Sequence, residues 1–316
     1  MRKRCLFSFF HLFFLCVGLC LCRGEGFFVV KQNCSMPLFS IEDFQHLPYY
    51  AGEHGTSCLK LINVLLPGTF LEFISKNEKG VCKVSWHVNN KKRYDGYVHE
   101  WCLDRWCQKV SEDDVRWLPS PMSLEEAGKF FEKCPGKIPY CWGGACEKEI
   151  FLPKDTYVFE QMQERSDGGI NVKKPYKLHG FDCSGLLHRI SGGLLEHSTQ
   201  RLREQGKILW CIGKEDDVSS EDFQQTLEKQ LDELRDTDYI VIIGHVVVWW
   251  NGGIIEFRGV DYGCVFTQER DAIITRINEL IERSRARKEE DSDVRFIRWH
   301  PELLKEEFKT YFPQEE

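Results

Sequence analysis

The stretch GFDCSGLLH, residues 180–188, places a cysteine at the start of an apolar run, directly after a turn of small residues. Asp182 is of a residue type that caps helix N-termini, so we expect a helix to begin at Cys183. Backbone N–H groups at a helix N-terminus lack partners within the helix and lie at the positive end of its dipole, so they favour a thiolate over a thiol. The pattern therefore predicts a reactive nucleophile at Cys183.

A histidine that can serve as the base follows about sixty residues later, in IVIIGHVVVWWNGGIIEF at 240–257. Asn-Gly at 251–252, between two β-rich runs, predicts a two-residue hairpin loop. Side chains alternate along strands, so His245 and Glu256 share one face in this register, roughly 7 to 8 Å apart by backbone spacing. A long carboxylate side chain reaches that far and can orient the imidazole. We therefore predict a catalytic triad of Cys183, His245 and Glu256.

Three motifs carry a resemblance to a known family: FDCSGL at 181–186, PYCWGG at 139–144, and GHVVVWW at 244–250 with a polar residue in the return strand. Over roughly residues 122–300 the chain resembles the NlpC family of bacterial cell-wall cysteine peptidases. The resemblance implies an α+β fold with a circularly permuted papain-like catalytic domain. It also implies hydrolysis, without a cofactor, of the bond between γ-D-glutamate and a diamino acid in peptidoglycan stem peptides. At the position of Glu256 the family more often has histidine or another neutral polar residue, and a carboxylate can do the same job.

The resemblance also assigns contacts with the substrate. Tyr140 and Trp142 would line the cleft; alternatively, they pack under the catalytic helix. Asp182 and Ser184 would bind the free amine and backbone of the N-terminal L-alanine, and capping the helix is a structural role that is compatible with this. Arg201 is a candidate for contacting a substrate carboxylate, and its alternative is an exposed helix charge.

An insertion separates the two upstream motifs. The family usually joins them by a short polar loop, whereas 34 residues, 145–178, intervene here. A long loop beside an active site is typical of a lid or a specificity element, and a solvated decoration is the alternative.

The first residues have the pattern of a targeting segment. Basic residues at 2–4 precede a mostly apolar run at 5–22 and a small Gly24, which predicts a secretory signal peptide at 1–24. The apolar run is also near a membrane-spanning length, so an uncleaved anchor is the alternative. We expect an exported protein, periplasmic or extracellular, that contacts a membrane only if this segment is kept.

Charge and cysteine content narrow the possible partners. Without 1–24, the chain has 38 Lys and Arg, which is 42 less four, against 49 Asp and Glu, a net charge of −11. This argues against nucleic-acid binding.

Eleven of the fifteen cysteines lie outside 1–24, which allows five disulfides and one free thiol, and several unpaired buried cysteines are the alternative. Cys102 with Cys107, and Cys141 with Cys146, are spaced more widely than usual zinc pairs, so no metal site is expected.

Residues 25–117 read as short strands separated by turns. The β-branched and aromatic runs that predict them lie at 27–30, 59–65, 69–74, 81–88 and 96–101. Such a series favours a small β-barrel, and the pattern is similar to a bacterial SH3-like domain. This domain would bind wall peptides, form part of the active-site wall, or only pack against its neighbour.

The predicted catalytic domain occupies 118–316, after a Pro-Ser-Pro boundary at 119–121. Ser123 and Glu126 form a capping box, and apolar spacing predicts helices at 219–234 and 271–287. Peptidoglycan or its stem-peptide fragments are the expected partner. The alternatives are an acyltransferase or transpeptidase with the same Cys-His pair, and a wall-binding protein without activity.

Overall fold

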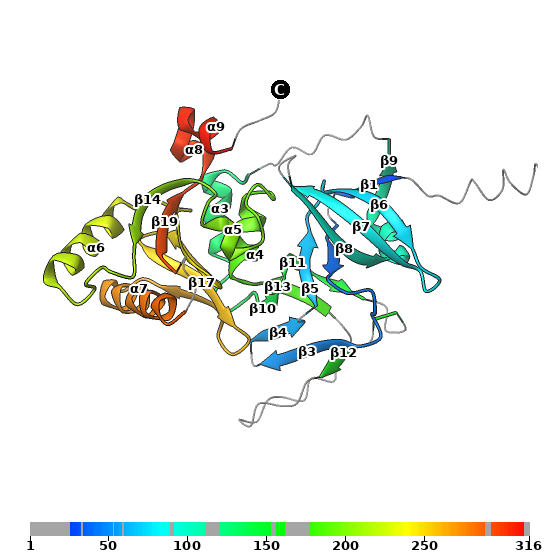
Figure 1. Ribbon diagram of the computed structural model, residues 1–316, viewed down its shortest axis with the longest axis horizontal. Helices are drawn as coiled ribbons and strands as arrows, with labels where there is room; N and C mark the ends of the chain where they lie inside the picture. Colours follow the sequence, from blue (N-terminus) through cyan, green and yellow to red (C-terminus); the bar gives the residue numbers. More distant parts are fainter. Residues whose placement is uncertain are drawn as a thin grey trace, which may run out of the picture.

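The computed structural model describes residues 26–32, 34–52, 54–58, 60–88, 92–111, 121–152, 156–157, 159–161, 177–287 and 292–312. These residues form a mixed α+β structure built on three β-sheets (Figure 1). The expected α+β class is confirmed. Across the described ranges, no helix is both long enough and apolar enough to cross a membrane.

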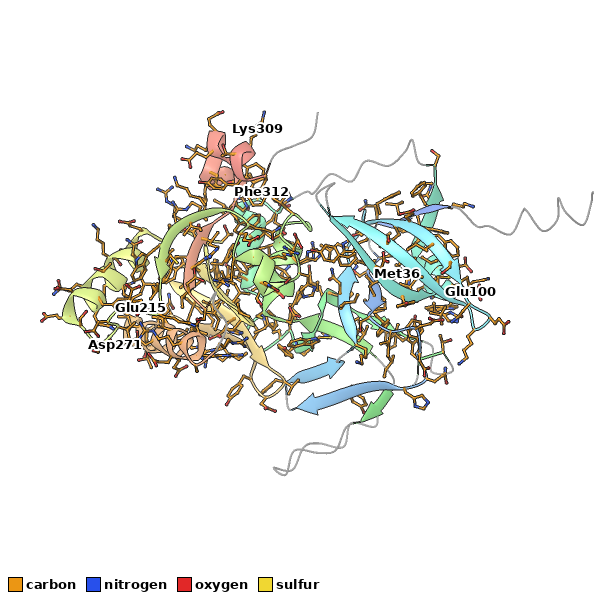
Figure 2. All side chains as sticks on the ribbon, viewed as in Figure 1. Met36, Glu100, Glu215, Asp271, Lys309 and Phe312 are labelled. Carbon is orange, nitrogen blue, oxygen red and sulfur yellow. The ribbon has the colours of Figure 1, made fainter. Side chains whose placement is uncertain are left out.

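The first sheet has seven antiparallel strands in the order β5-β2-β8-β7-β6-β1-β9. Its strands are β1 (Phe27–Val30), β2 (Met36–Phe39), β5 (Leu61–Leu65), β6 (Phe70–Lys76), β7 (Val81–Val88), β8 (Lys92–His99) and β9 (Cys107–Val110). β1 and β7 match the predicted strands residue for residue. Figure 2 shows Met36 of this sheet in the interior, where it is fully buried, and Glu215 at the periphery.

A helix replaces the end of the last predicted strand of this region. α2 (Glu100–Trp106) begins within the run at 96–101 that we expected to be extended. The imidazole of His99 caps it by accepting a hydrogen bond from the Trp101 N–H group at 3.2 Å. Within the run, Tyr97 still lies on β8, whereas Trp101 follows the helix cap.

The second sheet joins segments from both halves of the chain, in the order β11-β13-β10-β4-β3-β12. β3 (Leu47–Gly52) and β4 (Gly55–Cys58) form a hairpin, and β4 pairs in parallel with β10 (Tyr140–Trp142). The remaining strands are β11 (Ala145–Phe151), β12 (Phe159–Gln161) and β13 (Lys177–Phe181). Strand pairing thus crosses the boundary predicted at 117, and the two domain ranges remain predictions.

The third sheet is antiparallel, in the order β14-β19-β15-β16-β17-β18. Its strands are β14 (Lys207–Ile212), β15 (Tyr239–Ile242), β16 (His245–Trp250), β17 (Gly253–Gly259), β18 (Gly263–Thr267) and β19 (Val294–Arg298). The hairpin register is as predicted, because Trp250 pairs with Gly253 and Val248 with Ile255.

Helices cover both faces of the third sheet (Figure 1). Alternate residues such as Val247 and Ile254 pack in one cluster with α6 (Glu221–Glu233) and α7 (Arg270–Arg285). Their neighbours pack in a second cluster with α3 (Leu124–Phe131) and α4 (Cys183–Ile190). The capping box of α3 is confirmed, since Ser123 and Glu126 exchange both hydrogen bonds. The other helices are α5 (Thr199–Leu202), α8 (Pro301–Leu304), the short 3₁₀ helix η2 (Lys305–Glu307) and α9 (Phe308–Tyr311).

Some predictions fall outside the described residues. These are the signal peptide at 1–24, most of the boundary segment at 118–121, and residues 153–155, 158 and 162–176 of the insertion. In the part of the chain that the structure describes, ten cysteines are free, Cys183 among them. This agrees with the second expectation for the cysteines, several unpaired residues instead of a disulfide framework.

We expect Gly185→Ala to destabilise the fold, because a Cβ atom at this position in α4 would lie 1.9 Å from the carbonyl oxygen of Gly144. Overpacking of this kind costs about 1 to 3 kcal/mol of unfolding free energy, and urea denaturation would measure it. The matched control is Gly128→Ala in α3, whose Cβ would meet only Trp250 Nε1, at 3.7 Å. It should be neutral or stabilising by up to about 1 kcal/mol. Equal losses in the two variants would contradict the close approach at Gly185.

Candidate active site

The turn before α4 positions Cys183. β13 ends at Phe181, and Asp182 caps the helix by accepting a hydrogen bond from the Gly185 N–H group at 2.6 Å. Gly180 has φ +117°, and a Cβ there would lie 2.0 Å from the carbonyl oxygen of Pro139. Only glycine fits this position. The predicted start of the helix at Cys183 is therefore confirmed.

The ionisation of Cys183 differs from our expectation. Burial, followed by the charge of Asp182, raises the pKa of the Cys183 thiol to about 12. The backbone N–H groups of Val246, Ser184 and Cys183 itself act in the expected direction and lower the pKa, but burial outweighs them. In the free protein Cys183 is therefore a thiol at neutral pH.

His245 and Glu256 meet as predicted from the hairpin register. Nε2 of His245 lies 2.7 Å from Oε2 of Glu256, and both side chains are buried. Glu256 also accepts hydrogen bonds from Arg258 Nε at 2.7 Å and from Arg276 Nη2 at 2.9 Å. Burial raises the pKa of Glu256, but the hydrogen bonds and charges of His245 and Arg276 outweigh it and lower the pKa to about 2. The carboxylate is thus ionised and orients the imidazole through Nε2.

The thiol approaches the strand that carries His245. Cys183 packs in the cluster on the α4 face of the sheet, and the backbone N–H of Val246 acts on its sulfur. Glu256 instead faces α7, where Arg276 lies. Among the described residues, no hydrogen bond joins Cys183 Sγ to His245. The structure thus brings His245 and Glu256 together, but Cys183 packs on the opposite face of the sheet from Glu256 and has no closed contact with the imidazole.

A short contact fixes the loop before His245. The Gly244 N–H donates to Thr199 Oγ1 at 2.8 Å, at the start of α5. Gly244 has φ +83°, which favours glycine. Thr199 therefore helps to place the histidine at the start of its strand.

The residues expected to contact substrate are differently placed. Tyr140 is buried, and burial, with Asp182 and Cys183 nearby, raises the pKa of its phenol. Trp142 is 48% exposed on the same strand, β10, and is available to a ligand. Ser184 is buried and donates to Asp182 Oδ1 at 3.1 Å. Arg201 is exposed on α5. Burial and Glu196 raise the pKa of Tyr94, and the charge of Arg201 partly opposes this rise.

His197 is a residue of the site that was not predicted from the sequence. Nε2 of His197 lies 2.7 Å from Asp182 Oδ1, and Nδ1 lies 2.6 Å from Oδ1 of Asn63 on β5. No local motif marks Asn63, because it comes from a strand more than a hundred residues before the nucleophile. A polar residue in an otherwise apolar strand was the available signal.

Within the described ranges, no group of three or more His, Cys, Asp or Glu side chains is placed to hold a metal ion. A cavity of about 1110 Å³ lies between α2 and β11, lined by Trp101, Arg105 and Trp106 among others. None of the predicted triad residues lines this cavity.

Comparisons with known proteins give distant structural likenesses. No protein-family model and no curated protein matches the chain. Two solved structures from Trichomonas vaginalis are similar to it, NlpC2 at 14% identity and NlpC1 at 13%, each over 74% of this chain with a TM-score of 0.25. The matches cover 68% of NlpC2 and 64% of NlpC1, so the chain spans about two thirds of each. We infer no activity from these likenesses.

The low pKa of Glu256 predicts a specific acid sensitivity. Its folded value of about 2 lies below its ordinary value of 4.5, so its stabilising effect is complete above pH 4.5 and is lost as the pH falls towards 2. We expect this group to contribute roughly 3 kcal/mol to the fall in unfolding free energy over that window. Glu256→Gln should remove this part of the pH dependence in urea denaturation, even if it lowers stability overall.

The matched control is Glu215→Gln, at an exposed position on the periphery. It should leave the pH dependence as it is in the unaltered protein. An unchanged slope in Glu256→Gln would contradict an ionised, paired Glu256.

Proposed function

We propose that the protein is an exported cysteine peptidase that hydrolyses an amide bond in peptidoglycan stem peptides, the bond between γ-D-glutamate and diaminopimelate. The observation that carries the proposal is the buried His245–Glu256 pair, 2.7 Å apart, at the end of the strand approached by the N-terminus of the Cys183 helix. The FDCSGL and PYCWGG motifs supply the substrate class by resemblance. By the same resemblance, we propose a permuted papain-like catalytic domain and an SH3-like domain that precedes it in the chain.

The tautomer of His245 follows from its partner. Glu256 is ionised and accepts a proton from Nε2, so in the neutral ring the lone pair is on Nδ1. Nδ1 is then the atom that takes the proton of the Cys183 thiol. The contact must close when substrate enters, as catalytic hydrogen bonds often do.

The chemistry proceeds in two halves. Transfer of the Cys183 proton to His245 gives a thiolate, which attacks the amide carbonyl carbon. Backbone N–H groups at the start of α4 stabilise the oxyanion, and the His245 imidazolium then gives its proton to the leaving amine. The resulting thioester is hydrolysed by water, with His245 as the base, and the thiol is regenerated.

Arg258 and Arg276 limit the effect of the Glu256 charge on His245. Arg258 and Arg276 share its charge, so Glu256 stabilises an imidazolium less than an unshared carboxylate would. Its main effect is then to hold the ring and its tautomer. This agrees with a protonated thiol in the free protein and with proton transfer during attack.

The substrate side has room for the amine of L-alanine at Asp182. Its Oδ1 already receives three hydrogen bonds, but Oδ2 receives only that of the Gly143 N–H among the described residues. Oδ2 can accept at least one further hydrogen bond, so a position remains there for an ammonium group. The exposed indole of Trp142 offers a surface for the rest of the peptide.

The test is mass spectrometry of muropeptides and of L-Ala-γ-D-Glu-diaminopimelate after incubation with the protein, with Cys183→Ala, and with Cys211→Ala. We expect release of L-Ala-D-Glu to fall at least about a thousandfold in Cys183→Ala, because the nucleophile is lost. Cys211 is exposed on β14, outside the proposed machinery, so Cys211→Ala should keep full release.

Two results would count against the peptidase. Release that persists in Cys183→Ala would exclude this nucleophile. Binding of the tripeptide without release by any of the three proteins would favour an acyltransferase or a wall-binding protein.

A further inference from the structure

Three buried side chains form a hydrogen-bonded row beside the nucleophile. Asp182 precedes Cys183, His197 lies in the loop before α5, and Asn63 lies on β5 of the first sheet. His197 bridges the other two, at 2.7 Å to Asp182 Oδ1 and 2.6 Å to Asn63 Oδ1. The side chain of His197 is 3% exposed, and Asn63 is fully buried. The row thus links the first sheet to the start of α4.

The orientation of the Asn63 amide is fixed by its own backbone. The N–H group of Val64 donates to the same Asn63 atom at 2.7 Å, so that atom is the carbonyl oxygen. Nδ1 of His197 must therefore donate to it. The other end is also an acceptor, because His197 and the N–H groups of Gly185 and Gly143 outweigh burial and lower the pKa of Asp182. Both ring nitrogens therefore face acceptors, an arrangement that favours the doubly protonated ring.

Two other titratable residues, His188 and Glu196, lie near His197 in space or in sequence. The ring of His188 stacks on it at 5.6 Å, and burial and His197 lower the pKa of His188 to about 4, so His188 is neutral. Glu196, the preceding residue, is bonded to Tyr94. Among the described residues, the charged group that is hydrogen-bonded to His197 is Asp182.

The position of Asp182 makes this charge important for Cys183. A carboxylate next to a thiol disfavours the thiolate, as Asp182 does for Cys183, and a cation paired with the carboxylate opposes that effect. We propose that His197, held as an imidazolium by Asn63, is a positioning residue that offsets the charge of Asp182 and so keeps Cys183 ionisable. The first sheet then controls the nucleophile through Asn63. The benefit to peptide hydrolysis rests on the proposed function, but the effect on the thiol does not.

Alkylation tests this role without any substrate. The rate of reaction of Cys183 with iodoacetamide is measured between pH 7 and 9 by mass spectrometry of the Cys183 peptide, for the full chain and for His197→Gln. Below the pKa of the thiol the rate follows the thiolate fraction. We expect His197→Gln to react about tenfold more slowly, which corresponds to a rise of about one unit in the pKa of Cys183. The exposed Cys211 in the same digests is the internal control and should react at an unchanged rate.

A pair of variants at Asn63 separates charge from packing. Asn63→Leu removes the acceptor for Nδ1 and should slow alkylation of Cys183 to a similar degree. Asn63→Asp restores an acceptor and should bring the rate back to within about threefold of the unaltered protein. Unfolding would be recognised because the buried cysteines would also react.

Two outcomes would overturn the role of His197. One is a rate in folded His197→Gln equal to or above that of the unaltered protein. The other is an equal rate in Asn63→Leu and Asn63→Asp. Either can occur whether or not the protein releases L-Ala-D-Glu, so a failure of this inference is distinguishable from a failure of the peptidase.

Discussion

The buried carboxylate of Asp182 is the constraint on which the site depends. A buried charge is costly unless it is paired and hydrogen-bonded, and Asp182 is paired with His197 and bonded to the N–H groups of Gly143 and Gly185. These partners come from the β10–β11 turn, the first turn of α4 and the loop before α5. One side chain thus sets the relative positions of three segments around the nucleophile. Glu256 repeats the arrangement on the other face of the third sheet, where Arg258 and Arg276 compensate its charge.

The two buried carboxylates, Asp182 and Glu256, differ in their surroundings. Asp182 lies next to the thiol and must be neutralised by a neighbour if a thiolate is to form. Glu256 lies beyond the imidazole and must stay ionised to hold Nε2. Cys183 therefore has a raised pKa, whereas the imidazole of His245 is held by an ionised carboxylate.

Short sequence patterns predicted the features that depend on residues close together in the chain. The cap at Asp182, the start of α4 and the register that joins His245 to Glu256 follow from residue types at fixed spacings. The β3–β4 hairpin was missed because its residues do not form a β-branched run, and its pairing with β10 lies far along the chain. The Asn63–His197 contact was missed for the same reason. The protonated state of Cys183 depends on burial, which spacing does not reveal.

The second sheet has a consequence for how the chain folds. β4 pairs with β10 and β3 pairs with β12, and both partners come later in the chain. The hairpin therefore keeps unpaired edges until about a hundred further residues have been synthesised. Closing such long loops is slow, and an exposed edge can pair with another chain in the meantime. The N-terminal strands are therefore dependent on the later sequence for their completion. The edges of the hairpin stay open during synthesis until β10 and then β12 have emerged.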